Sequence, residues 1–179
     1  GEKIVYEKDG ETIDPDQILP DAMRPGMEWI RENTPADAVI MSWWDYGHAI
    51  RAYAGREPVV DAPSREALTT TVSKHLGKDP DEIECEECVP HEMLQEIAGL
   101  LLTEDDSQAV TIMEKYGATY LYIHQEDEAK SVALFIVLGE EQRPLGDTVL
   151  GRALTGEIIE GFELVYEDYV SAVYALESL

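Results

Sequence analysis

Residues 38–47 read AVIMSWWDYG, and the rest of the chain can be arranged around this stretch. Its first four residues form a compact apolar run with the length of a buried strand. Side chains of neighbouring strand residues point to opposite faces, so Trp43 and Trp44 cannot both enter one core. We therefore expect at least one of the two tryptophans at a surface or in a pocket.

Asp45 and Gly47 give the end of this stretch its chemical character. A carboxylate between aromatic rings, as at Asp45, is suited to accept a hydrogen bond from a buried hydroxyl. Gly47 allows the backbone to turn tightly. For an ordinary Trp-Trp pair, the simpler interpretation is an aromatic cluster that stabilises a strand-to-helix turn.

The segments on either side alternate between short helices and short strands. A helix that begins near Arg24 and stops at Asn33-Thr34-Pro35 precedes the stretch, and a helix from His48 to about Ala54 follows it. The later patterns predict a strand at 58–61, a helix start at 64–66, amphipathic helices at 91–103 and 106–116, a strand at 119–123 and a buried helix at 127–138.

The C-terminal part has a different character. From Leu145 onward, glycines punctuate short β-leaning runs, and residues 162–165 and 169–174 alternate as the two strands of a hairpin do. The predicted fold class is α+β, with a mainly helical core, a few short strands and a β-rich C-terminal segment. The 179 residues fit a single domain that is large enough to bury a substantial core.

The charge balance excludes one class of partner. The chain has 38 Asp and Glu against 13 Lys and Arg, a net charge of −25. A field of that sign repels phosphate backbones, so we expect no nucleic-acid binding. Asn33 is the only asparagine and glutamine occurs five times. This scarcity of amides favours a thermophile over a salt-adapted source, with a merely acidic protein as the alternative.

No stretch of the sequence has the length of a membrane span. The longest uninterrupted apolar run is the seven residues from Val132 to Leu138, whereas a spanning helix needs about 20. The chain opens on Gly1 rather than Met and has no charged-then-apolar signal. These features suggest a fragment of something longer.

The pentapeptide Trp43-Trp44-Asp45-Tyr46-Gly47 resembles the signature of the catalytic subunit of oligosaccharyltransferase, the enzyme of asparagine-linked glycosylation. In that family the motif follows a helix that ends in a Thr-Pro turn, as residues 34–47 do here. The resemblance continues through His48-Ala49-Ile50 and Ala54-Gly55-Arg56 to Val60-Asp61. Archaeal members are the most similar, and their C-terminal globular domain is about this size in its shortest forms.

The family has a second element near the first, of the form Asp-x-x-Lys-x-x-x-Met or Ile. Asp127-Glu128-Ala129-Lys130 supplies its Asp and Lys, and Leu134 stands where Met or Ile is usual. An acid and a base three residues apart are common on any helix, so this match is the weaker of the two. Pairing of strands 38–41 and 119–123 would bring both motifs to one pocket.

The resemblance implies a role for each motif. The family attaches a lipid-linked glycan to Asn in N-x-S/T sequences, and its globular part binds the Ser or Thr at the +2 position. The implied roles are binding of the +2 hydroxyl by Trp43, Trp44 and Asp45, contact with the threonine methyl by the element of Asp127, Lys130 and Leu134, and a structural role for Tyr46 and Gly47.

The resemblance also places the chain within a larger protein. It implies that residues 1–179 are one extracytoplasmic globular domain, excised from a multi-spanning membrane enzyme and inactive alone. The catalytic residues and the divalent cation, Mn or Mg, belong to the membrane part, so none of these is expected in this fragment. The implied partners are the acceptor polypeptide, the lipid-linked oligosaccharide and the membrane domain of the same chain.

Cys85-Glu86-Glu87-Cys88 is a further cluster, with His91 three residues beyond it. A structural zinc site needs four ligands, and the chain has no second Cys-x-x-Cys. On the outer face of a membrane, a local disulfide between Cys85 and Cys88 ranks first, free thiols second and a metal third.

One alternative belongs to another class of protein. A non-catalytic secreted or surface module could use the Trp-Trp-Asp pocket to bind a hydroxylated ligand such as a sugar. The parent reading frame separates the two hypotheses, because membrane spans upstream of Gly1 would support the oligosaccharyltransferase.

Overall fold

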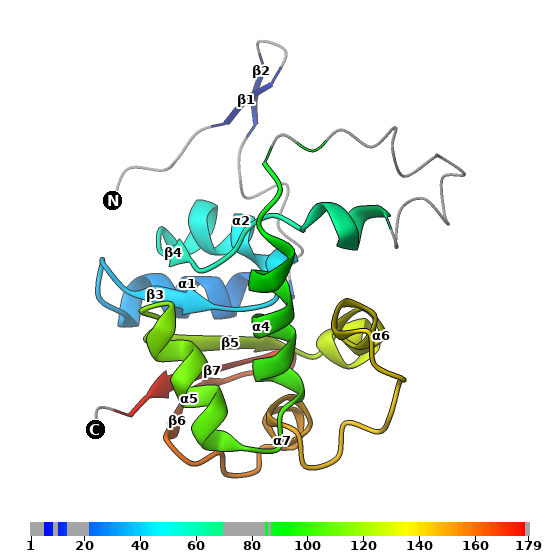
Figure 1. The fold of residues 1–179 in the computed structure, drawn as a ribbon. Helices are drawn as coiled ribbons and strands as arrows, with labels where there is room; N and C mark the ends of the chain where they lie inside the picture. Colours follow the sequence, from blue (N-terminus) through cyan, green and yellow to red (C-terminus); the bar gives the residue numbers. More distant parts are fainter. Residues whose placement is uncertain (1–5, 9–10, 14–21, 70–84, 86, 178–179) are drawn as a thin grey trace.

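The computed structural model describes residues 6–8, 11–13, 22–69, 85 and 87–177, and its centre is a five-stranded mixed sheet (Figure 1). The helices are α1 (Arg24–Asn33), α2 (Gly47–Ala49), α4 (His91–Leu102), α5 (Asp106–Lys115), α6 (Asp127–Leu138) and α7 (Val149–Thr155), with a 3-10 turn at Trp44–Tyr46 and a π-helical turn at Ile50–Ala54. The strands are β1 (Tyr6–Lys8), β2 (Glu11–Ile13), β3 (Val39–Met41), β4 (Glu57–Pro58), β5 (Tyr120–His124), β6 (Phe162–Glu167) and β7 (Ser171–Leu176). This arrangement confirms the α+β class.

The sheet has the strand order β4-β3-β5-β7-β6. Strand β3 pairs in parallel with β4 and with β5, where Ile40 lies opposite Tyr120. Strand β7 is antiparallel to both β5 and β6. The pairing of β3 with β5 confirms the contact expected between strands 38–41 and 119–123, and it brings the carboxyl ends of both strands to the same edge.

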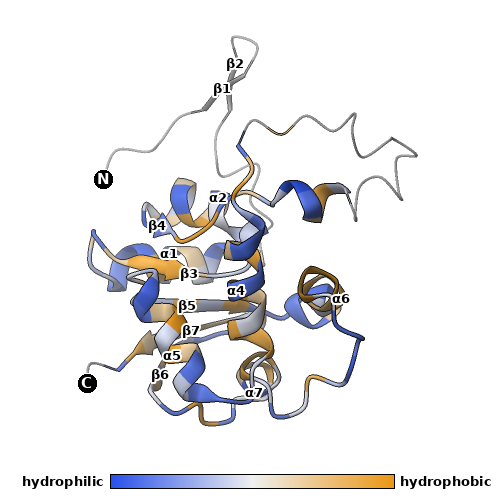
Figure 2. Cartoon of the chain, viewed as in Figure 1, coloured by the Kyte–Doolittle hydropathy of each residue, from blue (hydrophilic) through white to orange (hydrophobic). Residues whose placement is uncertain are grey.

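Helices cover both faces of this sheet. In Figure 1, α4 and α5 lie in front of the strands and α1 lies behind them. Helix α1 packs closely on the sheet, since Trp29 stacks on Tyr166 with ring centroids 5.2 Å apart. Figure 2 shows hydrophobic colour on the central strands and hydrophilic colour on many outward turns and loops. Strand β5 is therefore buried on both sides, with Leu121, Tyr122 and Ile123 all 2% exposed or less.

The C-terminal end of α1 is held by Arg56, which lies just after the left-handed Gly55 (φ 61°). The Arg56 guanidinium donates to the carbonyl oxygen of Arg31 at 2.6 Å and to that of Thr34 at 2.7 Å. Carbonyl groups in the last turn of a helix have no partner within the helix. Arg56 therefore ties the segment that follows the Trp-Trp-Asp motif to α1.

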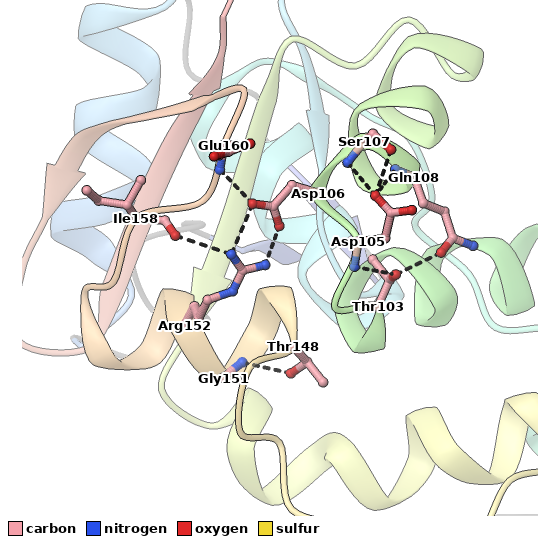
Figure 3. Close-up of polar contacts among 10 residues, drawn as sticks. All are labelled: Thr103, Asp105, Asp106, Ser107, Gln108, Thr148, Gly151, Arg152, Ile158 and Glu160. Carbon is pink, nitrogen blue, oxygen red and sulfur yellow. Dashed lines mark hydrogen bonds and ion pairs between the residues drawn. The ribbon is translucent and has the colours of Figure 1, made fainter.

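A second set of polar contacts ties α5 to α7 (Figure 3). Asp105 caps the start of α5 by accepting from the backbone N–H groups of Ser107 and Gln108. The next residue, Asp106, forms an ion pair with Arg152 of α7 and accepts from the backbone N–H of Glu160 at 2.7 Å. The side chains of Asp106 and Arg152 are 14% and 15% exposed, so this ion pair is largely shielded from water.

Helix α7 corrects the prediction of β-leaning runs after Leu145. Thr148 caps this helix by accepting from the backbone N–H of Gly151 at 3.1 Å. Gly151 lies inside this helix, and a Cβ atom there would come within 2.3 Å of the Gly146 carbonyl oxygen. This glycine therefore permits close packing rather than a turn, and the β-rich character is confined to β6 and β7.

The other predicted elements lie within a few residues of the elements in the structure. The predicted helices at 91–103, 106–116 and 127–138 correspond to α4, α5 and α6. A helix occupies 65–69 after Ser64, whose hydroxyl accepts from the backbone N–H of Ala67. The continuation of this helix and most of the acidic loop at 77–90 lie outside the described residues. No helix among the described residues has the length and apolar character to cross a membrane.

Candidate functional site

The Trp-Trp-Asp motif leaves the end of β3 in a tight 3-10 turn. Trp43 is 4% exposed and belongs to the core, whereas Trp44 is only partly buried against it. The two neighbouring rings thus have different surroundings, as expected for adjacent residues at the end of a strand. Asp45 lies within this turn, and its side chain is 26% exposed.

Gly47 allows this turn to pack against the segment after β4. A Cβ atom on Gly47 would lie 2.2 Å from the Val60 carbonyl oxygen and 2.4 Å from the Asp61 Cα atom. Both neighbours are backbone atoms, so neither can move aside without shifting the chain. The structure therefore gives Gly47 a packing role.

Helix α6 presents the second motif beside the first. Strand β5 ends at His124, and α6 starts at Asp127 after a two-residue connection. Because β3 and β5 are parallel, the turn after β3 and the helix after β5 leave the sheet at the same edge. The expected meeting of Asp45 and Lys130 is confirmed, since Lys130 Nζ lies 2.6 Å from Asp45 Oδ2.

The ion pair between Asp45 and Lys130 leaves one carboxylate oxygen without a partner. Asp45 Oδ1 is buried and has no hydrogen-bond partner among the described residues. Burial by itself would lower the pKa of Lys130, but the Asp45 carboxylate more than offsets it, so this pKa is raised. Lys130 therefore stays charged at neutral pH and pairs with the Asp45 carboxylate, a strong hydrogen-bond acceptor.

Asp127 lies beneath this pair rather than at the surface. It is 2% exposed, and its Oδ2 accepts from the backbone N–H of His124 at 2.9 Å. Burial raises the pKa of Asp127 to about 7, although the His124 N–H and the Tyr46 hydroxyl act in the opposite direction. Its geometry is that of a group that fixes the start of α6, and its expected role in ligand binding stays a prediction.

Leu134, the third residue of the second motif, is buried. It lies one helical turn beyond Lys130 and is 1% exposed, within the core cluster. In this structure Leu134 packs α6 onto the core. The expected contact between Leu134 and a threonine methyl stays a prediction.

Two further residues shape the site and were not predicted. Glu126 Oε2 lies 3.2 Å from Lys130 Nζ, an i,i+4 pair that its spacing could have indicated. His124 Nδ1 accepts from the backbone N–H of Glu126 at 3.1 Å, which leaves the proton of a neutral ring on Nε2. Burial lowers the pKa of His124, which favours this neutral ring. No sequence signal marked His124, because its role depends on the loop between β5 and α6.

The other predicted cluster lies apart from these residues in the sequence. Cys85 and Cys88 form a disulfide with their Cα atoms 5.5 Å apart. Among the residues that the structure describes, no group of three or more His, Cys, Asp or Glu side chains could hold a metal ion.

Solved structures show which class of protein has this fold. The C-terminal globular domain of oligosaccharyltransferase from Archaeoglobus fulgidus matches with a TM-score of 0.65 and 15% identity, over 89% of this chain and 99% of that domain. The oligosaccharyltransferase AglB of Archaeoglobus fulgidus, solved with an inhibitory peptide and a dolichol-phosphate, matches with a TM-score of 0.57 and 15% identity, over 84% of this chain and 23% of that protein. The fold is thus that of an archaeal oligosaccharyltransferase C-terminal globular domain.

Curated sequence relatives agree with the structural neighbours. The dolichyl-diphosphooligosaccharide–protein glycosyltransferase subunit STT3B of Oryza sativa subsp. japonica is 49% identical over 67 residues, which are 37% of this chain and 9% of that protein. The subunit stt-3 of Caenorhabditis elegans is 48% identical over 50 residues, 28% of this chain and 7% of that protein. The chain is similar to these oligosaccharyltransferase subunits over part of its length, and it spans less than a tenth of the length of these relatives.

One comparison matches a different family. A family model described as HaoA-associated protein HaoB matches residues 2–135. That range ends inside α6 and omits β7, which pairs with the central strand β5 along its whole length. The match divides the folding unit and is unrelated to the family that the other comparisons support.

Proposed function

We propose that this chain is the acceptor-recognition domain of an oligosaccharyltransferase, and that it binds the +2 Ser or Thr of N-x-S/T sequences. The observation that carries the proposal is Asp45 Oδ1, an oxygen without a partner on a carboxylate that Lys130 holds by its other oxygen. A hydroxyl that donates to Asp45 Oδ1 would satisfy this oxygen. A peptide without that hydroxyl would leave it buried and unpaired, which is how such a site discriminates.

The proposal assigns each motif residue a position in the complex. Asp45 accepts from the +2 hydroxyl, Lys130 orients the carboxylate, and Trp44 supplies the partly exposed apolar wall beside it. Trp43 supports Trp44 from the core, where it is 4% exposed. The structural neighbours support a peptide partner, because one of them was solved with an inhibitory peptide.

The wider protein is part of the same proposal. The chain would be one extracytoplasmic domain of a membrane enzyme that transfers a lipid-linked oligosaccharide to asparagine, and it would be inactive alone. The catalytic residues and the divalent cation, Mn or Mg, would belong to the part of the enzyme outside these residues. The alternative of a non-catalytic binding module is not favoured, because the relatives are glycosyltransferase subunits.

The test replaces Asp45 in the full-length enzyme that carries this domain. We expect Asp45→Ala to lower glycosylation of an N-x-T peptide by about 10- to 100-fold, the loss expected for a hydrogen bond to a charged group. Asp37→Ala is the matched control, because Asp37 is an exposed aspartate just before the other end of β3. Near-normal transfer by Asp45→Ala, in an enzyme with an unchanged melting temperature, would contradict the proposal.

A further inference from the structure

The hydroxyl of Tyr46 lies at the centre of the site although its ring is buried. The residue is 2% exposed, and its ring packs against those of Tyr122 and His124, with centroids 5.4 and 5.6 Å away. Lys130 Nζ donates to the Tyr46 hydroxyl at 2.9 Å and lies 4.3 Å from the centroid of the ring. A residue that packs in the core thus also contacts the cation of the binding site.

The ammonium group of Lys130 has three polar partners. It has three donors and no acceptor. Lys130 Nζ donates a hydrogen bond to the Tyr46 hydroxyl at 2.9 Å and forms ion pairs with Asp45 Oδ2 at 2.6 Å and Glu126 Oε2 at 3.2 Å. Glu126 is 65% exposed, whereas the Tyr46 ring is fixed by packing on both of its neighbours. Tyr46 is therefore the rigid member of the three.

The direction of the hydrogen bond at Tyr46 follows from the same chemistry. Because Lys130 can only donate, the Tyr46 oxygen must accept, and its own hydrogen stays available for the Asp127 carboxylate. Burial, followed by the charges of Asp127 and Asp45, raises the pKa of Tyr46 far above its ordinary value. The hydroxyl therefore stays neutral and serves as a fixed acceptor for Lys130.

We propose that Tyr46 is a positioning residue for acceptor binding, because its hydroxyl fixes Lys130 against Asp45 Oδ2 and so leaves Asp45 Oδ1 free for the acceptor hydroxyl. A lysine stem is flexible, and an ammonium without this anchor can reach either carboxylate oxygen. An ammonium on Asp45 Oδ1 would compete with the ligand for the same oxygen. This inference rests on the proposed function of Asp45.

The test compares two tyrosine variants in the full-length enzyme. Tyr46→Phe removes the hydroxyl and keeps the ring, and we expect the KM for an N-x-T peptide to rise about tenfold with little change in kcat, as for one lost hydrogen bond. Tyr122→Phe is the matched control. It removes a hydroxyl from an equally buried neighbouring ring, whose oxygen has no hydrogen-bond partner among the described residues, so the KM should stay at the wild-type value.

A double-mutant cycle separates positioning from simple packing. If Tyr46 acts through Lys130, then Tyr46→Phe should raise the KM in the wild-type background and have no effect in a Lys130→Met background. Equal effects in both backgrounds, or an unchanged KM in Tyr46→Phe, would overturn the inference. Should Tyr46→Phe fail to fold, 3,5-difluorotyrosine at position 46 keeps the hydroxyl but makes it a weaker acceptor. A several-fold rise in KM then supports the inference, and no rise refutes it.

The same assay separates this inference from the proposed function. Asp45→Ala is measured in parallel with both tyrosine variants. A normal KM and kcat in Asp45→Ala would refute the proposed function itself. A strong defect in Asp45→Ala together with a normal KM in Tyr46→Phe would refute only the positioning role of Tyr46.

Discussion

Gly47 illustrates how a single residue can determine the position of a functional side chain. It follows Asp45 and Tyr46 directly, and its Cα packs against the backbone of Val60 and Asp61. Any side chain at this position would push the 3-10 turn away from that backbone. The turn that presents Asp45 therefore depends on the absence of a single methyl group.

We expect Gly47→Ala to destabilise the chain by about 2 kcal/mol or more. The added Cβ overlaps backbone atoms, which can move away only if the chain itself shifts. The matched control is Gly99→Ala in the middle of α4, where nothing lies within 4 Å of the added Cβ. That control should stabilise the chain by about 0.5–1 kcal/mol through helix propensity. Chemical unfolding measures both changes, and a tolerated Gly47→Ala would contradict the packing described for this turn.

Asp127 gives the chain a pH dependence of unusual sign. Its pKa is raised by burial from 3.8 to about 7 in the folded chain. Between these two values the folded state binds more protons than the unfolded state, so the free energy of unfolding contributed by this group falls as the pH rises. Below about pH 4 Asp127 is protonated in both states, and it does not lower the free energy of unfolding. Above about pH 7 it is ionised in both states, and its lowering of the free energy of unfolding is complete.

Asp127→Asn isolates this contribution, because asparagine does not titrate and can still accept from the His124 N–H. We expect the stability of the wild type relative to Asp127→Asn to decline steadily between about pH 4 and pH 7. Urea unfolding of both proteins at several pH values measures the difference. A difference that stays constant over this range would show that the pKa of Asp127 is not raised.

At the scale of elements, the ion pair between Asp106 and Arg152 holds α5 against α7. Arg152 also donates to the Ile158 carbonyl oxygen at 3.3 Å, so one side chain joins α7 to the loop before β6 (Figure 3). Removal of either partner leaves a charge in a site that is less than one-sixth exposed. This contact therefore joins elements that the sequence separates by almost fifty residues.

We expect Arg152→Met to destabilise the chain by on the order of 3 kcal/mol, because Asp106 keeps a poorly solvated charge. The double variant Asp106→Asn with Arg152→Met should recover part of that loss, since the stranded charge is gone. The control is Arg31→Met, which removes an exposed arginine whose ion pair with Glu32 is 3.7 Å long. Equal stability of the single and double variants would argue against a stranded charge.

At the scale of the whole molecule, the net charge of −25 opposes the compact state. Like charges on one surface repel each other, and dissolved salt screens that repulsion over about 10 Å at 0.1 M. We therefore expect the melting temperature to rise by several degrees when NaCl is increased from about 0.02 to about 0.5 M. Calorimetry at both concentrations measures this, and a melting temperature that falls with salt would show that attractive pairs outweigh the repulsion.

Local sequence determined much of the architecture of this protein. The helices α4, α5 and α6 follow from apolar residues at helical spacing, and the hairpin of β6 and β7 follows from alternation. The prediction failed at α7, because Gly151 has the same local signature whether it makes a turn or permits close packing. What decides is the Gly146 carbonyl oxygen, 2.3 Å from where a Cβ would lie.

In the candidate site, too, some features follow from the sequence and others only from the tertiary structure. The sequence by itself determined that Asp45 ends a buried strand between aromatic residues and that Lys130 lies on a helix after another strand. Only the tertiary structure decided that they meet, because the parallel pairing of β3 and β5 closes a separation of more than eighty residues. The tertiary structure also decided which residues are buried, because the exposed fraction of a side chain depends on which distant elements pack against it. Tyr46 thereby gained a partner in Lys130, while Leu134 was placed in the core.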